Sequence, residues 1–208
     1  MTLRLNGSTS GYTEIDAPAV AGSNTLRFPG GNGSDGNILG TDGAGNLSWV
    51  NGRMVLATAQ NSTSGTSIDF TGIPSWVKKI SVMLNGVSTN GSSLQIIQLG
   101  TSGGFQTSGY SSAASTNGAS NTATAGILVT YRGDAANTIR GLLTLALLDP
   151  STGVWVASGV TCGAGVGNDD SSCSGSKTLS GTLDRIRITT VNGTDTFDAG
   201  SINILYEG

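Results

Sequence analysis

From about residue 52 onward, hydrophobic residues fall in short runs separated by clusters of Gly, Ser, Asn and Pro. Ile80, Val82 and Leu84 occupy every second position of residues 79–84, which is typical of a β-strand with one buried face. Repeated runs with turn residues between them predict two packed antiparallel sheets. The predicted strands span residues 54–58, 67–70, 79–84, 94–99, 127–131, 138–148, 154–157, 186–190 and 202–206.

Turn residues indicate how some of these strands are connected. Asn85-Gly86 is a strong turn dipeptide and predicts a hairpin that leads into residues 94–99. Residues 142–148 have helical propensity, but the turn at residues 149–153 makes them one arm of a hairpin. Residues 101–125 consist largely of Ser, Gly, Thr, Ala and Asn, and we expect long loops there.

Residues 1–50 have a different pattern, with short extended pieces between Gly, Ser, Asn and Pro. The glycine-rich residues 30–37 and 42–46 tolerate positive φ and predict two hairpin-like turns. Such a segment buries too little surface to offset an ordering entropy of roughly 1 to 2 kcal/mol per residue. The sequence thus predicts an all-β protein, with an extended N-terminal arm (residues 1–50) and an antiparallel, jelly-roll-like β-sandwich (residues 51–208).

The arm carries more large apolar side chains than a solvated linker normally does. We therefore expect it to attach to other chains, with a flexible linker as the alternative. The candidate attachment residues are Ile15, Val20, Leu26, Phe28, Ile38, Leu39, Leu47 and Trp49.

Composition narrows the range of functions. Glycine contributes 33 of 208 residues and charged residues only 11%, against a usual charged fraction of about 25%, which favours turn-rich β structure over helices. Histidine is absent, and with it the Ser-His-Asp triad and the commonest nitrogen ligand for metals. We expect a protein that is not an enzyme and has no catalytic, cofactor-binding or metal-binding residues.

The charge pattern and hydropathy give expectations about partners. Ten Lys and Arg residues stand against thirteen Asp and Glu residues, and Lys78-Lys79 is the largest basic cluster, which disfavours nucleic-acid binding. No apolar run approaches the roughly 18 residues of a membrane span, and residues 1–7 lack the apolar stretch of a secretory signal. We expect a soluble, cytoplasmically made protein without membrane insertion.

Two further groups of residues are candidates for a special role. Cys162 and Cys173 enclose ten residues rich in Gly, Ser, Asn and Asp, and a disulfide closing this loop would contribute roughly 3 kcal/mol. The alternative is a pair of free thiols. Phe105 and Tyr110 lie in the Ser/Gly-rich segment, where we expect an exposed surface for contact with a host.

Two stretches resemble virion proteins of bacteriophages, in particular tail fibre, tailspike and capsid decoration proteins of cyanophages and related phages. The first comprises GSTSGY at residues 7–12, APAVAGSNTL at residues 17–26, GNGS at residues 31–34 and TDGAGNLSW at residues 41–49, and it is similar to segments that precede phage fibre domains. The second comprises IDFTGIPSW at residues 68–76, SGTLDRIRITT at residues 180–190 and NGTDTFDAGSINILYE at residues 192–207, and it is similar to a C-terminal β-sandwich of such proteins.

The resemblance implies a homotrimer with a β-sandwich head on the particle surface. Only about 50 residues precede the predicted sandwich, without coiled-coil heptads or a β-helix repeat. We therefore expect a trimeric cement or decoration protein, made in the host cytoplasm, that binds the major capsid protein, reinforces the outer capsid surface and helps adsorb to the host. The alternative is a receptor-binding head at the tail tip that contacts host surface polysaccharide.

Overall fold

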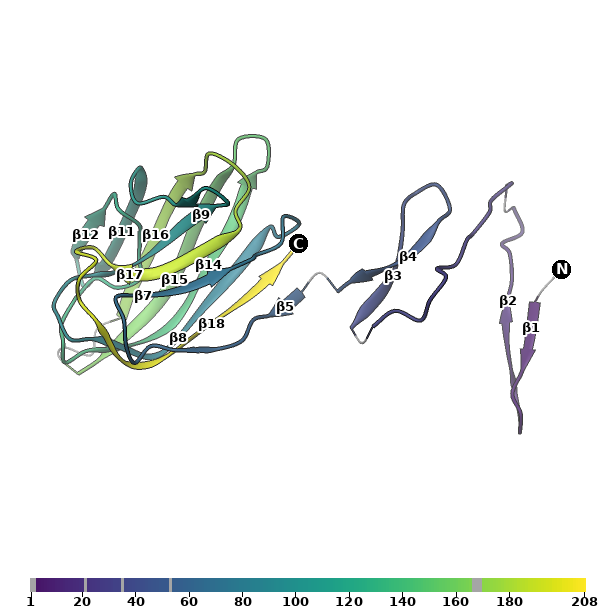
Figure 1. Ribbon diagram of the computed structural model, residues 1–208, viewed down its shortest axis with the longest axis horizontal. Coiled ribbons are helices and arrows are strands. Elements are labelled where there is room, and N and C mark those ends of the chain that lie inside the picture. Colours follow the sequence, from purple (N-terminus) through teal and green to yellow (C-terminus); the bar gives the residue numbers. More distant parts are fainter. Residues whose placement is uncertain (1–2, 21, 35, 53, 166–169) are drawn as a thin grey trace. The chain divides into compact units, whose positions relative to one another are not determined.

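The computed structural model describes residues 3–20, 22–34, 36–52, 54–165 and 170–208. The chain divides into two compact units, Met1–Gly52 and Arg53–Gly208 (Figure 1). Every regular element in the described part of the chain is a β-strand, and every pair of named strands is antiparallel. The predicted all-β, antiparallel fold class is confirmed.

The N-terminal unit consists of two hairpins. Their strands are β1 (Leu3–Asn6) with β2 (Tyr12–Ile15), and β3 (Asn37–Thr41) with β4 (Leu47–Asn51). The predicted turn at residues 42–46 joins β3 to β4, where the Asp42 carboxylate accepts hydrogen bonds from Ala44 N and Asn46 Nδ2 at 2.8 and 2.6 Å.

A turn does occur within residues 30–37, because Asn37 N donates to Ser34 O at 3.0 Å, but it joins no pair of strands, so the predicted hairpin there is wrong. The other hairpin instead turns at residues 7–11, where Gly7 N donates to Gly11 O at 3.0 Å. A glycine cluster permits a turn, but a hairpin also needs two flanking segments that pair. Of residues 22–29, which precede this glycine cluster, none belongs to a strand, and Arg27 forms an isolated bridge to Asn46.

The C-terminal unit contains two sheets, which form two layers in Figure 1. The five-stranded sheet comprises β7 (Ser67–Thr71), β17 (Arg185–Thr190), β9 (Gln95–Thr101), β10 (Gly104–Phe105) and β13 (Ile127–Leu128). The nine-stranded sheet comprises β12 (Ala119–Ala123), β11 (Tyr110–Thr116), β16 (Asp170–Thr178), β15 (Val154–Ala164), β14 (Thr138–Asp149), β8 (Lys79–Thr89), β18 (Phe197–Glu207), β5 (Met54–Leu56) and β6 (Gln60–Asn61).

A single apolar core lies between the two sheets. The alternation predicted for residues 79–84 holds, because Ile80 and Val82 are fully buried while Ser81 and Met83 are half-buried. Every buried or partly buried member of the core belongs to residues 57–206, so the C-terminal unit has a core of its own. The sheet-on-sheet packing is that of a β-sandwich.

The hairpin predicted at Asn85-Gly86 is wrong. β8 continues to Thr89 and pairs with β18, while residues 95–101 belong to the other sheet. Gly86 has φ 68° and lies at a bulge beside Gly200, which has φ 91°. A Cβ on Gly200 would lie 2.4 Å from the carbonyl carbon of Gly86. The glycine therefore permits a bulge and a close approach of two strands.

The long loops predicted for residues 101–125 are also wrong, because β10, β11 and β12 lie there. β11 pairs with β16, another strand rich in Ser and Gly, and β16 pairs with the long strand β15. These segments lack strong alternation of apolar residues. Backbone pairing with an already ordered neighbour makes them strands, and this is not visible in local sequence.

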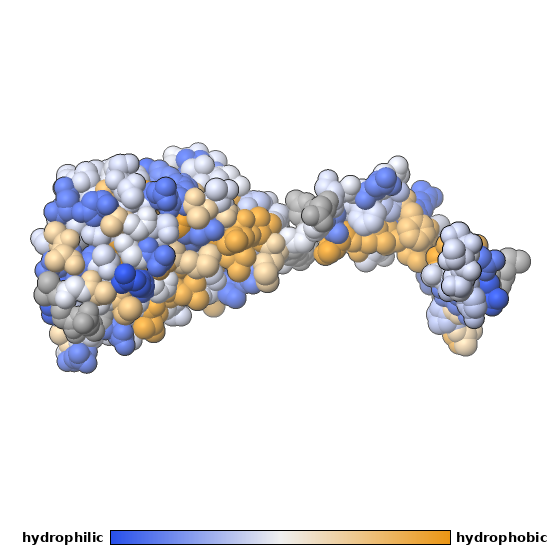
Figure 2. Space-filling model, turned by 90° about the horizontal axis from the view of Figure 1, so that it is seen from below, coloured by the Kyte–Doolittle hydropathy of each residue, from blue (hydrophilic) through white to orange (hydrophobic). Residues whose placement is uncertain are grey.

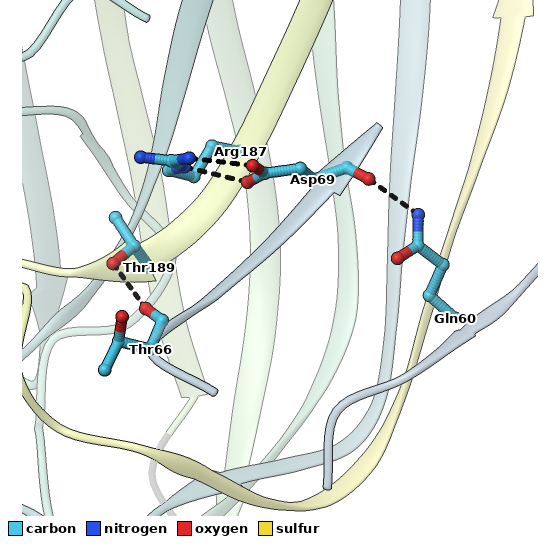
Figure 3. Close-up of polar contacts among 5 residues, drawn as sticks. All are labelled: Gln60, Thr66, Asp69, Arg187 and Thr189. Carbon is cyan, nitrogen blue, oxygen red and sulfur yellow. Dashed lines mark hydrogen bonds and ion pairs between the residues drawn. The ribbon is translucent and has the colours of Figure 1, made fainter. Parts of the chain in front are cut away.

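Polar contacts fix the register of the five-stranded sheet (Figure 3). Arg187 and Asp69 lie directly opposite each other on β17 and β7, and two hydrogen bonds of 2.8 and 2.7 Å join the guanidinium to the carboxylate. Gln60 Nε2 donates to Asp69 O at 2.7 Å, and Thr189 Oγ1 donates to Thr66 O at 2.7 Å. These contacts tie β7 and the residue before it to β17, its neighbour in the sheet, and to β6, which precedes it in the chain.

Two substitutions on β14 test the position of the core. Leu145 is 0% exposed, and Leu148 on the same strand is 67% exposed. We expect Leu145→Ala to lower the free energy of unfolding by about 2 to 5 kcal/mol, because it leaves a cavity between the sheets. Leu148→Ala is the matched control and should change it by less than about 0.5 kcal/mol. Urea unfolding measures both, and equal effects would contradict the assigned faces of β14.

Candidate functional site

The N-terminal unit presents its apolar side chains to solvent. Every residue of this unit with a described burial is exposed or half-buried. Seven of the eight predicted attachment residues are exposed, from 40% at Trp49 to 93% at Val20, and the eighth, Leu47, is half-buried. The exposed ones are Ile15, Val20, Leu26, Phe28, Ile38, Leu39 and Trp49. The unit therefore has no apolar core of its own.

The β3–β4 hairpin carries apolar groups on both faces. Leu39 lies opposite Trp49 on one face, and Ile38 lies opposite Val50 on the other. Trp49 Nε1 donates to Gly31 O at 2.6 Å, which holds residues near the start of this hairpin against the indole. Figure 2 shows hydrophobic atoms along one side of this hairpin.

The β1–β2 hairpin has two unlike faces. Leu3 lies opposite Ile15 on one face, whereas Arg4 lies opposite Glu14 on the other. Arg4 forms an ion pair with Glu14, and its guanidinium lies 4.1 Å from the ring centroid of Tyr12. An isolated two-stranded hairpin is marginally stable in water. An apolar face on such a hairpin is therefore suited to packing against another surface.

Tyr110 is not an exposed contact residue, so this prediction is wrong. Its side chain is 4% exposed, and its hydroxyl accepts a hydrogen bond from Leu99 N at 2.7 Å and donates to Gln106 O at 2.8 Å. The residue is the first of β11, and the pairing of β11 with β16 turns its ring into the core. Burial raises the pKa of Tyr110 to about 12.

Phe105 is half-buried on β10. Its ring lies beneath Arg187, with 4.1 Å between the guanidinium carbon and the ring centroid. Arg185 lies 5.7 Å from the same centroid and pairs with Asp184. Phe105 therefore covers the ion pairs of the five-stranded sheet, and its contact with a host stays a prediction.

The predicted disulfide between Cys162 and Cys173 is wrong, because both thiols are free. In the β15–β16 ladder, Cys173 lies opposite Gly159, and Cys162 lies opposite Asp170. The two cysteines are therefore three positions apart along the ladder, which corresponds to about 10 Å. Cys173 faces the core and Cys162 faces the other side of the sheet. A disulfide needs Cα atoms about 4.4 to 6.8 Å apart. Residues 166–169 of the predicted loop lie outside the described residues.

Two depressions occur at one end of the sandwich, on either side of residues 180–183. Their volumes are about 500 and 420 Å³. Both are lined by Ser75, Ser180, Thr182 and Leu183, and the larger one also by Lys78. This lining offers hydroxyl groups for hydrogen bonding, and volumes of this size lie in the range of small-molecule sites.

Asp184 and Asp195, near the end of the chain, serve as hydrogen-bond acceptors. Asp184 accepts two bonds from Arg185, and this pairing lowers the pKa of the Asp184 carboxyl. Asp195 accepts from Ser93 N at 2.9 Å and from Asn192 Nδ2 at 2.6 Å. Over the described ranges, no three His, Cys, Asp or Glu side chains gather closely enough to hold a metal ion. The same part of the chain contains no helix that could span a membrane.

Comparison with known proteins gives no relative: no family model matches the chain, and neither a curated protein nor a solved structure matches it significantly.

Thiol labelling tests the positions of the cysteines. Cys173 is 3% exposed, and burial raises the pKa of its thiol to about 11. We expect the folded protein to react quickly at the half-buried Cys162 and slowly at Cys173, because the thiolate is the reactive form. Cys162→Ser should remove the fast phase and Cys173→Ser the slow one. Mass spectrometry counts the labels, and denatured, unreduced protein that takes up none would establish a disulfide instead.

The Tyr110 hydroxyl predicts a pH dependence of stability. Because folding raises its pKa from 10.0 to about 12, the associated stability is fully present below pH 10 and is lost as the pH rises toward 12. The rise corresponds to roughly 3 kcal/mol. Near pH 8, Tyr110→Phe should cost about 1 to 3 kcal/mol, because it leaves the buried Leu99 N–H without its partner.

The difference between wild type and Tyr110→Phe should then shrink between pH 10 and 12 in denaturant unfolding. Tyr12→Phe removes an exposed hydroxyl from the N-terminal unit and is the matched control. A difference that stays constant over this pH range would contradict the assigned role of the Tyr110 hydroxyl.

Proposed function

We propose that this chain is a non-enzymatic structural protein of a bacteriophage particle, a trimeric cement or decoration protein of the outer capsid surface. Its N-terminal unit attaches to the major capsid protein, and its C-terminal unit is the displayed head. One observation carries the proposal. The N-terminal unit is rich in apolar side chains, yet none of its residues with a described burial is buried.

The mechanism of attachment is associative. The exposed apolar faces of both hairpins supply area to be buried, at about 1.5 to 3 kcal/mol for each fully buried large side chain. Part of this free energy offsets the entropy of ordering the unit against its partner. Binding to assembled capsid stabilises the shell by mass action, since the protein binds the assembled state in preference to the separated subunits.

Three copies in one trimer strengthen this attachment. Once one N-terminal unit is bound, the other two bind at a high effective concentration, so modest individual affinities combine into a stable attachment. No turnover is required. The absence of histidine from the sequence and the use of Asp184 and Asp195 as structural acceptors agree with a binding role.

A second candidate function is a receptor-binding head for host surface polysaccharide. The hydroxyl-lined depressions around residues 180–183 favour it. The two functions differ in where the protein lies on the particle. Gold-labelled antibody spread over the capsid supports the decoration protein, whereas label confined to the tail tip supports the receptor-binding head.

Deletion of residues 1–52 tests the attachment. The C-terminal unit should remain folded, because all core residues belong to residues 57–206. We expect the truncated protein to lose co-sedimentation with capsids stripped of this protein, while circular dichroism and cooperative unfolding stay close to those of the full chain. Undiminished co-sedimentation would move the attachment to the C-terminal unit.

A pair of point variants in the full chain controls for the size of the deletion. Val20→Asp places a charge at the most exposed apolar position of the N-terminal unit, and we expect it to weaken capsid binding at least tenfold. Ser10→Asp adds the same charge at a polar position of this unit and should leave binding within about twofold. Equal effects would indicate a general response to charge.

A further inference from the structure

The two depressions at one end of the sandwich share a wall, so a single ligand can reach both of them. The wall consists of residues 180–183, in the connection from β16 to β17, and we call it the ridge. Residues 180–183 line the larger depression of about 500 Å³ and the smaller one of about 420 Å³, and Ser75 lines both as well. The two depressions are therefore neighbouring parts of one surface.

The larger depression has an apolar floor and a polar rim. The floor consists of core side chains that are at most 4% exposed, namely Val77, Trp155, Leu179 and Leu183. The exposed polar side chains of the rim belong to Ser75, Lys78, Ser151, Thr152, Ser180 and Thr182. Five of these six side chains carry a hydroxyl group. A ligand with C–H groups on one face and hydroxyl groups around its edge matches this arrangement.

Backbone hydrogen bonds hold the segments around the larger depression in place. Leu179 N donates to Gly153 O at 3.0 Å, which ties the β16–β17 connection to the β14–β15 turn. Gly153 has φ 68°, and a Cβ there would lie 2.9 Å from Leu179 O, so this close approach requires glycine. Lys78 N donates to Glu207 O at 2.7 Å, and Leu147 N donates to Lys78 O at 2.8 Å. The walls are thus formed before a ligand arrives, which lowers the entropic cost of binding.

Lys78 gives the larger depression a positive charge. It is exposed, and it is the only ionisable residue among the described residues that line this depression. The neighbouring Lys79 forms the ion pair with Glu207. Within the described ranges, the Lys78 ammonium forms no ion pair. This cation is therefore available to an anionic group of a ligand.

The smaller depression adds hydroxyl groups on the other side of the ridge. Thr101 and Ser102 line it in addition to the shared residues, and so does Asp184. The Asp184 carboxylate already accepts two hydrogen bonds from Arg185. A ligand that crosses the ridge thus meets hydroxyl groups on both sides and one available cation, Lys78, on one side.

We propose that the two depressions form one binding site for an acidic oligosaccharide. A carboxylate of one sugar unit pairs with Lys78, and the next units cross the ridge into the smaller depression. The proposal rests on the second candidate function, a head that contacts host surface polysaccharide, and it names the class of polysaccharide. Each sugar ring offers hydroxyl groups to the rim and a C–H face to the apolar floor.

The lining favours this ligand over three simpler ones. A neutral oligosaccharide would leave the Lys78 ammonium without a partner inside the site. A small inorganic anion would use Lys78 but would leave the hydroxyl groups of the ridge and of the smaller depression uncovered. A peptide offers few hydroxyl groups, and its large apolar side chains would find only the shallow floor of core residues.

Pairs of probes that differ only in charge test the proposal on the full chain. Tetragalacturonate carries a carboxylate on every unit, and its methyl ester keeps the same rings and hydroxyl groups without the charges. Tetramannuronate and its methyl ester form a second pair with different ring stereochemistry. In at least one pair the acid should bind about tenfold or more tightly than the ester, because the ester cannot form the charge-assisted hydrogen bond. Isothermal titration calorimetry measures the dissociation constants.

Variants of Lys78 test where the acid binds. Lys78→Gln should abolish the preference for the acid, and Lys78→Arg should restore it because the charge is kept. Arg140→Gln is the matched control, since it removes the same charge from an exposed position on β14. Arg140 lies seven residues from Leu147 of the larger depression, or about 23 Å along the strand. This control should leave the preference unchanged.

The length of the ligand tests the role of the ridge. The acidic tetramer should bind about fivefold or more tightly than its monomer, because units beyond the first reach the smaller depression. Equal affinities for tetramer and monomer would confine the ligand to the larger depression and overturn a site that crosses the ridge.

Each outcome decides the proposal. Equal affinities for acid and ester in both pairs overturn it, and so does a folded Lys78→Gln variant that keeps the preference. A preference that Arg140→Gln also abolishes would reflect the overall charge and overturns the site at Lys78. Urea unfolding establishes that the variants are folded, and Lys78→Met replaces Lys78→Gln if the latter does not fold.

Failure of this proposal can be distinguished from failure of the proposed function. Gold-labelled antibody that finds the protein on neither the capsid nor the tail overturns the role in the particle, whereas calorimetry on the purified chain still decides the site. A protein that lies on the particle but does not distinguish acid from ester keeps its structural role and loses only this site.

Discussion

The alternation of side chains along the strands β8, β14 and β18 is the constraint on which the rest of the structure depends. Because successive residues point to opposite faces, Ile80 and Val82 on β8 and Leu145 on β14 pack against the five-stranded sheet as one buried layer. The same alternation forces Met83 and Leu142 to the other side. Apolar residues at these positions therefore lie outside the core, with Leu142 46% exposed and Met83 half-buried.

This constraint gives the two units different roles. The C-terminal unit satisfies its own core and has large apolar side chains left over on the outer face of one sheet. The N-terminal unit consists of hairpins with two strands each, and two strands cannot enclose a core. Its apolar residues are therefore available only to a partner. Both units expose apolar side chains to solvent, and this exposed surface is the physical basis of the structural role that we propose.

Local sequence predicted the fold where apolar residues alternate or flank a clear turn. The β14–β15 hairpin around residues 149–153 and the β3–β4 hairpin around residues 42–46 are of this kind. The strands β11, β12 and β16 consist mainly of small polar residues and Ala, and local sequence does not reveal them because their stability comes from pairing with neighbours. Asn85-Gly86 predicts a turn but forms a bulge, since a glycine with positive φ suits both.

By itself, the sequence determined the all-β class, the division near residue 52 and the apolar character of the N-terminal unit, because these depend on composition and on the period of the hydrophobic pattern. Only the tertiary structure decided which face each residue occupies. Strand register buried Tyr110, placed Cys162 and Cys173 on opposite faces and aligned Val160 with Leu142. Register joins residues far apart in the chain, and a shift of one position exchanges the two faces of a strand, so no local pattern specifies it.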